Sequence, residues 1–138
     1  MSDAFISYRR KPSEEFANLL QEKLKNKKID AFIDTQRLEK GEFSPQLVNA
    51  IKNSPNFICL LADGTLDSEW VRKEIQLAYE QGKHFVPVFL HHQGYQYDKV
   101  VPYIKTYPAI EKLLSFQGVD VHNVGDINYY AHRIAKLL

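Results

Sequence analysis

Residues 57–61, Phe-Ile-Cys-Leu-Leu, form a continuous apolar run, as expected of a strand that is buried on both faces of a sheet. A turn at Asp63-Gly64 follows, then a helical pattern that Asp67-Ser68 is placed to cap and Gly82 to end. A second apolar run comes next, Phe85-Val86-Pro87-Val88-Phe89. This strand, helix, strand order predicts a right-handed crossover between two parallel strands. Because Pro87 lacks an N–H, we expect the second strand to lie near a sheet edge, or Pro87 to lie at its start.

The same alternation extends toward the N-terminus. Ala4-Phe5-Ile6-Ser7-Tyr8 reads as a first strand, and Ala31-Phe32-Ile33 as a short second one. Between them Ser13 is a predicted helix cap, with Glu14 and Glu15 in the first turn and apolar positions at Phe16, Leu19, Leu20 and Leu24. Ser44-Pro45 predicts the start of a further helix with a stripe of Leu47, Ala50 and Ile51.

The pattern weakens toward the C-terminus. Residues 91–102 are expected to form a loop, and residues 103–114 are ambiguous because Pro108 should break a long helix. Gly118-Val119-Asp120-Val121 is a weak fifth strand, and Asp126 is a predicted cap for a last helix. We therefore expect one α/β domain over residues 1–138, a flavodoxin-like three-layer sandwich whose central, mostly parallel, five-stranded sheet has helices on both faces.

Composition excludes several classes of protein. The net charge of +1, from 18 basic and 17 acidic side chains, does not indicate a nucleic-acid partner. Cys59 is the only cysteine, so no disulfide forms within the chain, and a reducing, cytoplasmic location is expected. No apolar stretch is long enough to span a membrane, and the N-terminus lacks the pattern of a signal peptide. His91 and His92 are adjacent, the other three histidines are scattered and no cysteine pairs with them, so we expect no metal site.

Candidate functional residues follow the predicted strands. Ligands of such sheets bind at the carboxyl ends of the strands, where Tyr8-Arg9-Arg10 places two guanidinium groups suited to phosphate. The segment from Asp34 to Phe43 is longer than the usual strand-to-helix connection of about 2–6 residues, which is typical of functional loops. Its single glycine, Gly41, excludes a Gly-rich phosphate-binding loop.

A third group lies on the helix after the 57–61 strand. The i, i+4 spacing places Trp70 and Glu74 on one helix face, next to a core-facing stripe of Val71, Ile75, Ala78 and Tyr79. We therefore expect Trp70 and Glu74 at the border between core and solvent. Spacing alone does not make Glu74 a catalytic residue.

These motifs together resemble TIR domains. Asp3-Ala4-Phe5-Ile6-Ser7-Tyr8 is similar to the first box of the family, residues 34–41 to its long BB loop, and Ser68-x-Trp70-x-x-x-Glu74 to the signature of its third helix. The likeness is greatest to NAD⁺-hydrolysing members, namely the sterile-alpha/TIR enzymes of animal axon degeneration and bacterial antiviral effectors. The Phe-Trp of the third box is missing, since only Ser115-Phe116-Gln117 stands near that position.

The resemblance implies an NAD⁺ glycohydrolase that releases nicotinamide and ADP-ribose or a cyclic isomer, with NAD⁺ as substrate and no cofactor. Glu74 would be the catalytic glutamate, Trp70 and Tyr8 would border the nicotinamide, and the rest of the cleft would be lined by Arg9, Arg10, Asp34, Leu38, Glu39 and Phe43. Self-association into filament-like stacks would involve the loop residues Lys40, Gly41 and Glu42. A sensor domain or partner protein would then activate an immune or cell-death effector.

Two other interpretations stay open. The first is a non-enzymatic TIR adaptor that signals through contacts between TIR domains. The second is a receiver-like or flavodoxin-like binding domain, which the Tyr8-Arg9-Arg10 segment disfavours because a receiver needs paired acidic residues there.

Overall fold

The computed structural model describes residues 2–34 and 44–138. The elements, in chain order, are β1 (Ala4–Ser7), α1 (Arg10–Asn26), β2 (Ala31–Phe32), α2 (Pro45–Lys52), β3 (Asn56–Leu61), α3 (Glu69–Glu80), β4 (His84–Leu90), α4 (Tyr97–Thr106), α5 (Pro108–Ser115), β5 (Val119–Val121) and α6 (Ile127–Lys136). Short 3-10 turns cover Thr65–Asp67, His91–Gln93 and Val124–Asp126.

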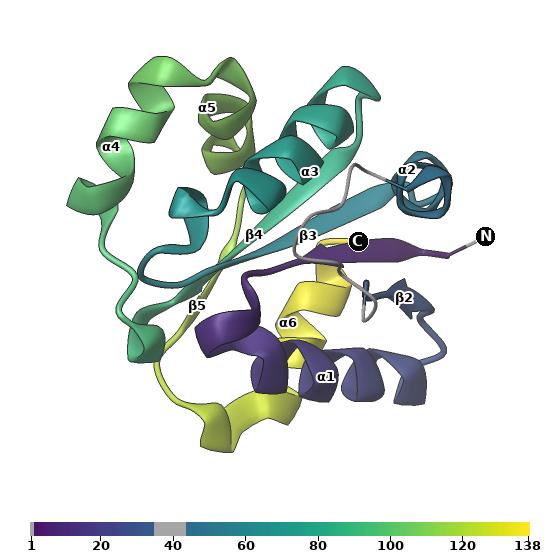
Figure 1. The fold of residues 1–138 in the computed structure, drawn as a ribbon. Coiled ribbons are helices and arrows are strands. Elements are labelled where there is room, and N and C mark those ends of the chain that lie inside the picture. The colour runs from purple at the N-terminus through teal and green to yellow at the C-terminus, as the bar shows by residue number, and fades with distance from the viewer. Residues whose placement is uncertain (1, 35–43) are drawn as a thin grey trace.

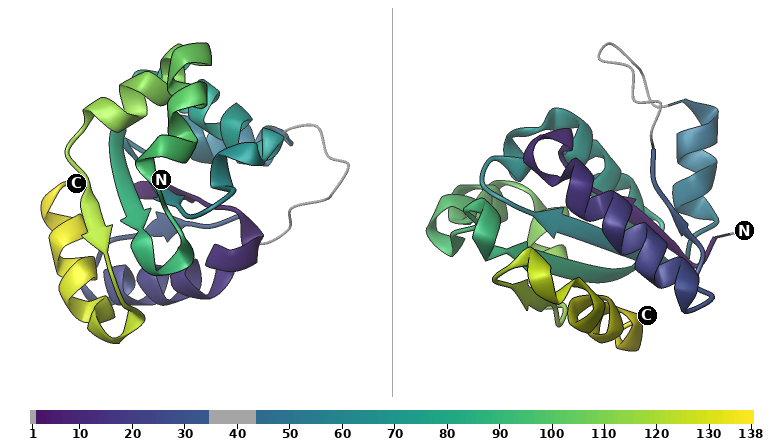
Figure 2. Two further views of the ribbon diagram at one scale, coloured as in Figure 1. Left: turned by 90° about the vertical axis from the view of Figure 1, so that its left-hand side faces the viewer. Right: turned by 90° about the horizontal axis from the view of Figure 1, so that it is seen from below.

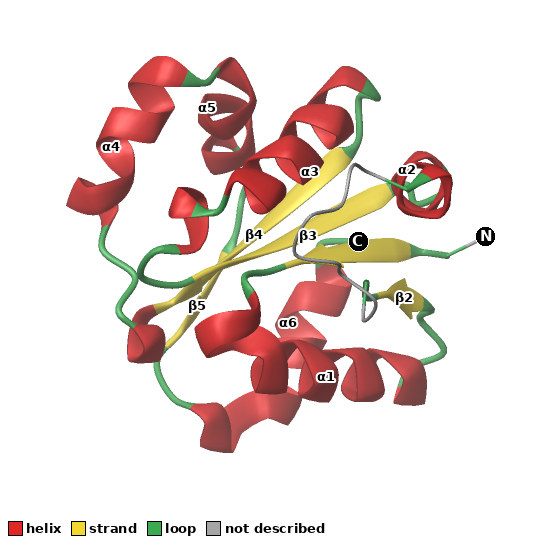
Figure 3. Ribbon diagram, viewed as in Figure 1, coloured by secondary structure: helices red, strands yellow, loops and turns green. Residues whose placement is uncertain are grey.

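The strands form one five-stranded sheet in the order β2-β1-β3-β4-β5. Every pairing among the described residues is parallel, and β3 occupies the centre of the sheet. Helices cover both faces: α1 and α6 lie on one, and α2, α3 and α5 on the other (Figures 1 and 3). The view from below places α1 and α6 across the same face (Figure 2). The predicted α/β three-layer sandwich is confirmed.

Each face of the sheet carries its own hydrophobic core, because successive strand residues point to opposite sides. In β1, Ala4 and Ile6 pack toward α1 and α6, whereas Phe5 packs toward α2, α3 and α5. A row of phenylalanine rings crosses the sheet on this second face. Phe5 stacks on Phe57 with centroids 5.6 Å apart, and Phe57 meets Phe85 edge-on at the same distance. These rings tie the three neighbouring strands together.

Two of the predicted caps are confirmed and two are not: Asp126 stands at the N-cap of α6, but its side chain makes no capping hydrogen bond. Ser44 Oγ accepts a hydrogen bond from the Leu47 N–H, and Ser68 Oγ from the Val71 N–H, so both serines cap their helices. Ser13 was expected to be a cap, but it is buried inside α1, which begins at Arg10 and is kinked at Lys11. Its hydroxyl donates to the Gln93 side chain at 2.8 Å instead.

One of the two alternatives expected for Pro87 is confirmed, because β4 lies next to the edge strand β5, whereas Pro87 does not lie at the start of β4. β4 lies between β3 and β5, and Pro87 is the fourth of its seven residues, paired in register with Cys59. A Cβ added to Gly118 would lie 2.4 Å from the Pro87 carbonyl oxygen, so this carbonyl faces the β5 side. Because the N–H and C=O of one strand residue face the same neighbour, the missing N–H also points there. Pairing with β5 begins only at Val88, so no ladder hydrogen bond is lost.

The C-terminal region differs from the expectation in one segment. Residues 91–102 are not a loop, because α4 begins at Tyr97 and contains Pro102. Only Val100 of α4 is buried, which explains why the helix has little apolar periodicity to detect. Pro108 does break the helical region, as expected, and it stands at the first position of α5. Among the described residues, no helix is both long and apolar enough to cross a bilayer.

Candidate active site

A buried carboxylate lies at the carboxyl end of β1. The Ser7 hydroxyl donates a hydrogen bond of 2.8 Å to Oε1 of Glu74, and both residues are 0% exposed. Ser7 is the last residue of β1, and Glu74 lies in the middle of α3. The expectation that Glu74 sits at the border between core and solvent is therefore wrong. An ionised group is costly to bury, so this pairing stands out as a candidate for function.

The position of Glu74 follows from the helical period. Val71, Ile75 and Ala78 are buried, and Glu74 falls within the same i, i+3, i+4, i+7 stripe. Tyr79, which was assigned to this stripe, is 39% exposed. Glu74 thus occupies a core position of α3, and its carboxylate reaches the end of the neighbouring strand.

Cys59 lies beside this pair. It is the register partner of Ser7 on β3, so the two side chains stand on the same face of adjacent strands. Burial, and then the negative charge of Glu74, raise the pKa of the Cys59 thiol well above its ordinary value. The thiol therefore stays protonated and is no nucleophile at neutral pH.

The loops after β1, β3 and β4 are joined at the same end of the sheet. Arg9 donates through Nη1 to the Gly64 carbonyl at 2.6 Å. Gly64 has a positive φ of 80°, and a Cβ there would lie 2.8 Å from Arg9 Nη1, so both the turn and this contact favour glycine. The Asp63 N–H donates to the Gln93 carbonyl at 3.0 Å, which connects the β3 and β4 loops.

The start of α3 is tied to α4. Arg72 donates through Nη1 to the Leu66 carbonyl at 2.7 Å, and its guanidinium lies over the ring of Tyr103, 5.9 Å from the centroid. The Tyr103 hydroxyl donates to Asp67, and this bond is the main reason that the pKa of Tyr103 is raised. These contacts hold the helix turn that carries Trp70.

The other predicted site residues are spread around this edge. Trp70 is half-buried and packs against the core beneath α3. Tyr8 is only 2% exposed and belongs to the core on the opposite face, so the sheet separates it from Glu74. Arg9 is exposed, while Arg10 at the start of α1 and Asp34 after β2 are half-buried. The remaining residues, Leu38, Glu39, Lys40, Gly41, Glu42 and Phe43, lie outside the described residues.

Sequence reasoning missed Ser7 as a partner of Glu74. One signal was available, because Ser7 is the only polar residue in an otherwise apolar strand. A buried hydroxyl needs a hydrogen-bond partner, but the partner lies 67 residues away and no local pattern points to it.

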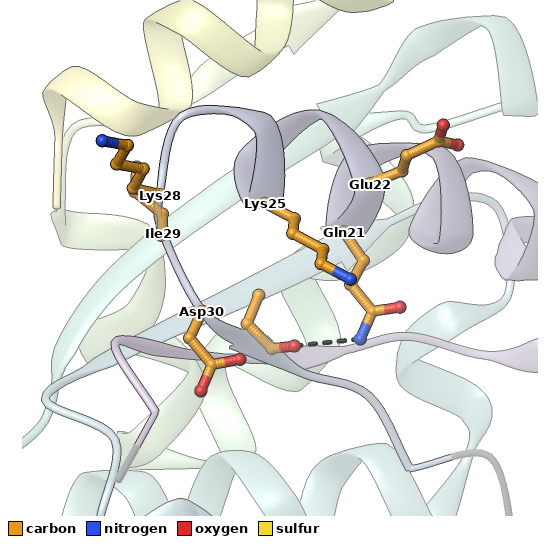
Figure 4. A pocket seen from close by; sticks show the side chains of 7 residues that line it. Gln21, Glu22, Lys25, Lys28, Ile29 and Asp30 are labelled. Atoms are coloured by element: carbon orange, nitrogen blue, oxygen red, sulfur yellow. Dashed lines mark hydrogen bonds between the residues drawn. The ribbon is translucent and has the colours of Figure 1, made fainter.

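A separate pocket lies elsewhere on the described part of the chain. It has a volume of about 640 Å³ and lies between the last turns of α1 and the start of β2. Charged side chains of both signs surround it, and Gln21 donates to the Ala31 carbonyl at 2.9 Å across its floor (Figure 4). It is at the amino end of β2, whereas ligands of parallel sheets bind at the carboxyl ends. Within the described part of the chain, no group of three or more His, Cys, Asp or Glu side chains is arranged to hold a metal ion.

The fold and this edge define an α/β domain with a buried carboxylate at the carboxyl end of a parallel sheet. The TIR-domain family model matches residues 4–135, and the chain belongs to this family. Among solved structures, the TIR domains of the activated Roq1 resistosome align over 99% of this chain and 98% of theirs, with a TM-score of 0.72 and 21% identity. The TIR domain of the Toll-related receptor TRR-2 from Hydra magnipapillata aligns over 99% and 97%, with a TM-score of 0.67 and 17% identity. These two likenesses concern the fold.

Curated relatives carry names that state an activity. NAD(+) hydrolase SARM1 of Danio rerio is 37% identical over 94 residues, which are 62% of this chain and 13% of the relative. NAD(+) hydrolase sarm1 of Drosophila melanogaster is 30% identical over 134 residues, which are 90% of this chain and 9% of the relative. The chain thus spans about a tenth of the length of these relatives.

Proposed function

We propose that this TIR domain cleaves the bond between nicotinamide and ribose in NAD⁺, with Glu74 as the catalytic carboxylate. The observation that carries the proposal is the Glu74 carboxylate, buried and hydrogen-bonded to Ser7 at the ligand-binding end of the sheet. Relatives named NAD(+) hydrolases, at 30 to 37% identity, support the choice of substrate.

The chemistry requires one carboxylate and no acid partner. Nicotinamide leaves NAD⁺ as a neutral molecule, so the leaving group needs no proton. The ribosyl group that remains is an oxocarbenium ion, which a nearby carboxylate stabilises, as in glycoside hydrolysis. Water attacks the same ribose carbon to give ADP-ribose, and a nitrogen of the adenine ring attacks it to give a cyclic isomer. One site therefore supports both hydrolysis and cyclisation.

Neighbouring side chains supply the contacts that NAD⁺ needs. Arg9 and Arg10 lie between the end of β1 and the start of α1, and guanidinium groups bind phosphate oxygens through paired hydrogen bonds. Trp70 lies one helical turn before Glu74 and offers an aromatic face for nicotinamide. We assign Asp34 to the border of this cleft, together with Leu38, Glu39 and Phe43 from sequence alone. Tyr8 is not part of it, because its ring is buried on the opposite face of the sheet. NAD⁺ is the substrate, and the proposal includes no cofactor.

The burial of Glu74 favours regulation of the activity by assembly. Because the side chain is fully buried, the groups that cover it must move before NAD⁺ reaches the carboxylate. We propose that contacts between TIR domains, made through Lys40, Gly41 and Glu42, drive this change. A head-to-tail contact of this kind generates open filaments. Since the chain spans about a tenth of its relatives, we also propose a sensor domain or partner protein that starts assembly.

The burial of Glu74 also favours a second candidate function. Glu74 is buried and hydrogen-bonded to Ser7, as a glutamate with a purely structural role would be. A TIR adaptor that signals only through contacts between domains needs no catalytic group. The two functions differ in whether NAD⁺ is consumed.

The test is to incubate the purified chain with NAD⁺ over a series of protein concentrations, with and without a crowding agent, and to separate the products by chromatography. We expect nicotinamide together with ADP-ribose or a cyclic isomer, and a specific activity that rises with protein concentration. Assembly observed by sedimentation without any loss of NAD⁺ would support the adaptor instead.

A further inference from the structure

Ser7 is a polar residue at a position where the fold calls for an apolar one. All four residues of β1 are buried, and the other three are Ala, Phe and Ile. A buried hydroxyl is costly unless it is hydrogen-bonded, and Ser7 meets this need through Oε1 of Glu74 at 2.8 Å. The serine at this strand end is therefore explained by the carboxylate that it contacts.

The hydrogen bond holds the far end of a long side chain. The Cα of Glu74 is fixed by α3, and its carboxylate is fixed by a strand on the other side of the core. A carboxylate accepts hydrogen bonds through its oxygens, so an anchor at Oε1 fixes the orientation of the group. A hydrogen bond donated to a carboxylate also favours its charged form.

We propose that Ser7 is a positioning residue that orients the Glu74 carboxylate, without contacting the substrate itself. This inference rests on the proposed function of Glu74. Cys59 is the titratable group on β3 that faces the same carboxylate, and it stays protonated, so it adds no competing negative charge.

The test compares Ser7→Ala with the wild-type chain at saturating NAD⁺. Loss of a hydrogen bond to a charged group should lower kcat about 10- to 100-fold and leave KM within about threefold. The acid limb of the kcat profile should move up by about one pH unit, because the charged form loses its donor. Ser7→Thr keeps a hydroxyl and should restore most of kcat. If the added methyl group of Ser7→Thr prevents folding, the pH profile of kcat in Ser7→Ala is the deciding measurement.

Ser54 offers a matched control. It is 1% exposed, it donates through Oγ to the Ala50 carbonyl at 2.7 Å, and it precedes the amino end of β3, away from Glu74. Ser54→Ala removes a buried hydroxyl together with its hydrogen bonds to Ser2 and to the Ala50 carbonyl, but it should keep the wild-type kcat and pH profile. Equal losses of kcat in both variants, or a wild-type kcat and acid limb in Ser7→Ala, would overturn the proposal.

A second measurement separates this proposal from the proposed function. If the wild-type chain cleaves no NAD⁺ under any condition, the proposed function fails. The hydrogen bond is then tested by the ¹³C titration of the Glu74 carboxyl group in the wild-type chain and in Ser7→Ala. A midpoint at higher pH in the variant supports the positioning role, and identical midpoints overturn it.

Discussion

The pair formed by Glu74 and Ser7 makes a quantitative prediction about stability. Glu74→Ala and Glu74→Gln both remove the buried carboxyl group. The effect of that removal on the free energy of unfolding is therefore common to both variants and cancels when they are compared. They differ in the acceptor: Gln keeps an amide oxygen near Ser7, whereas Ala leaves the Ser7 hydroxyl buried without a partner. An unsatisfied buried hydroxyl costs about 1–3 kcal/mol, and the cavity left by the shorter side chain adds to this.

We therefore expect Glu74→Ala to be less stable than Glu74→Gln by about 2 kcal/mol. For a chain of 138 residues, this corresponds to a difference in Tm of roughly 6–10 °C. The assay is thermal and urea unfolding of both variants, in the wild-type background and with Ser7→Ala. In the second background, the difference should shrink to about 1 kcal/mol or less, because the hydroxyl is already gone. Equal stability of the two variants in the wild-type background would refute the buried contact.

The remaining predictions concern three other positions. The pKa of Cys59, ordinarily 9.0, is raised by burial and then by Glu74, so above pH 9.0 only the unfolded chain releases this proton. The free energy of unfolding should then fall by about 1.4 kcal/mol per pH unit, and pH-dependent urea unfolding of Cys59→Ala should lack this component. Trp70→Ala should lower Tm and also raise KM for NAD⁺ when the kinetics are measured well below the melting temperature. A lower Tm with a normal KM would assign Trp70 to packing alone. Gly41→Pro should reduce sedimentable assemblies and NAD⁺ cleavage together with little change in Tm; full activity from a monomer would remove assembly from the mechanism.

The parts of the fold with regular periodicity could be predicted from the sequence. The apolar run at 57–61 is indeed the central strand, and the Ser44 and Ser68 caps start α2 and α3, because these signals are local. The position of Pro87 within β4 could not be predicted in this way. Whether a strand residue can do without its N–H depends on where the neighbouring strand begins, and that is set by the tertiary structure.

The candidate site was predicted in part. The helix spacing placed Glu74 one turn after Trp70, but a glutamate in an apolar stripe looks like a boundary residue unless its partner is known. That partner, Ser7, lies on another element, so the burial of Glu74 follows only from the three-dimensional structure. The roles assigned to Leu38, Glu39 and Phe43 stay predictions, since these residues lie outside the described part of the chain.

One comparison tests the central claim most directly. The wild-type chain and Glu74→Gln are brought to the same assembled state and incubated with saturating NAD⁺, and released nicotinamide is measured over time. Gln preserves the size of the side chain and an acceptor for Ser7 but lacks the negative charge that stabilises the ribosyl cation. We predict steady release by the wild-type chain and none above background by the folded variant. Release by Glu74→Gln at the wild-type rate would contradict the assignment of Glu74 as the catalytic carboxylate.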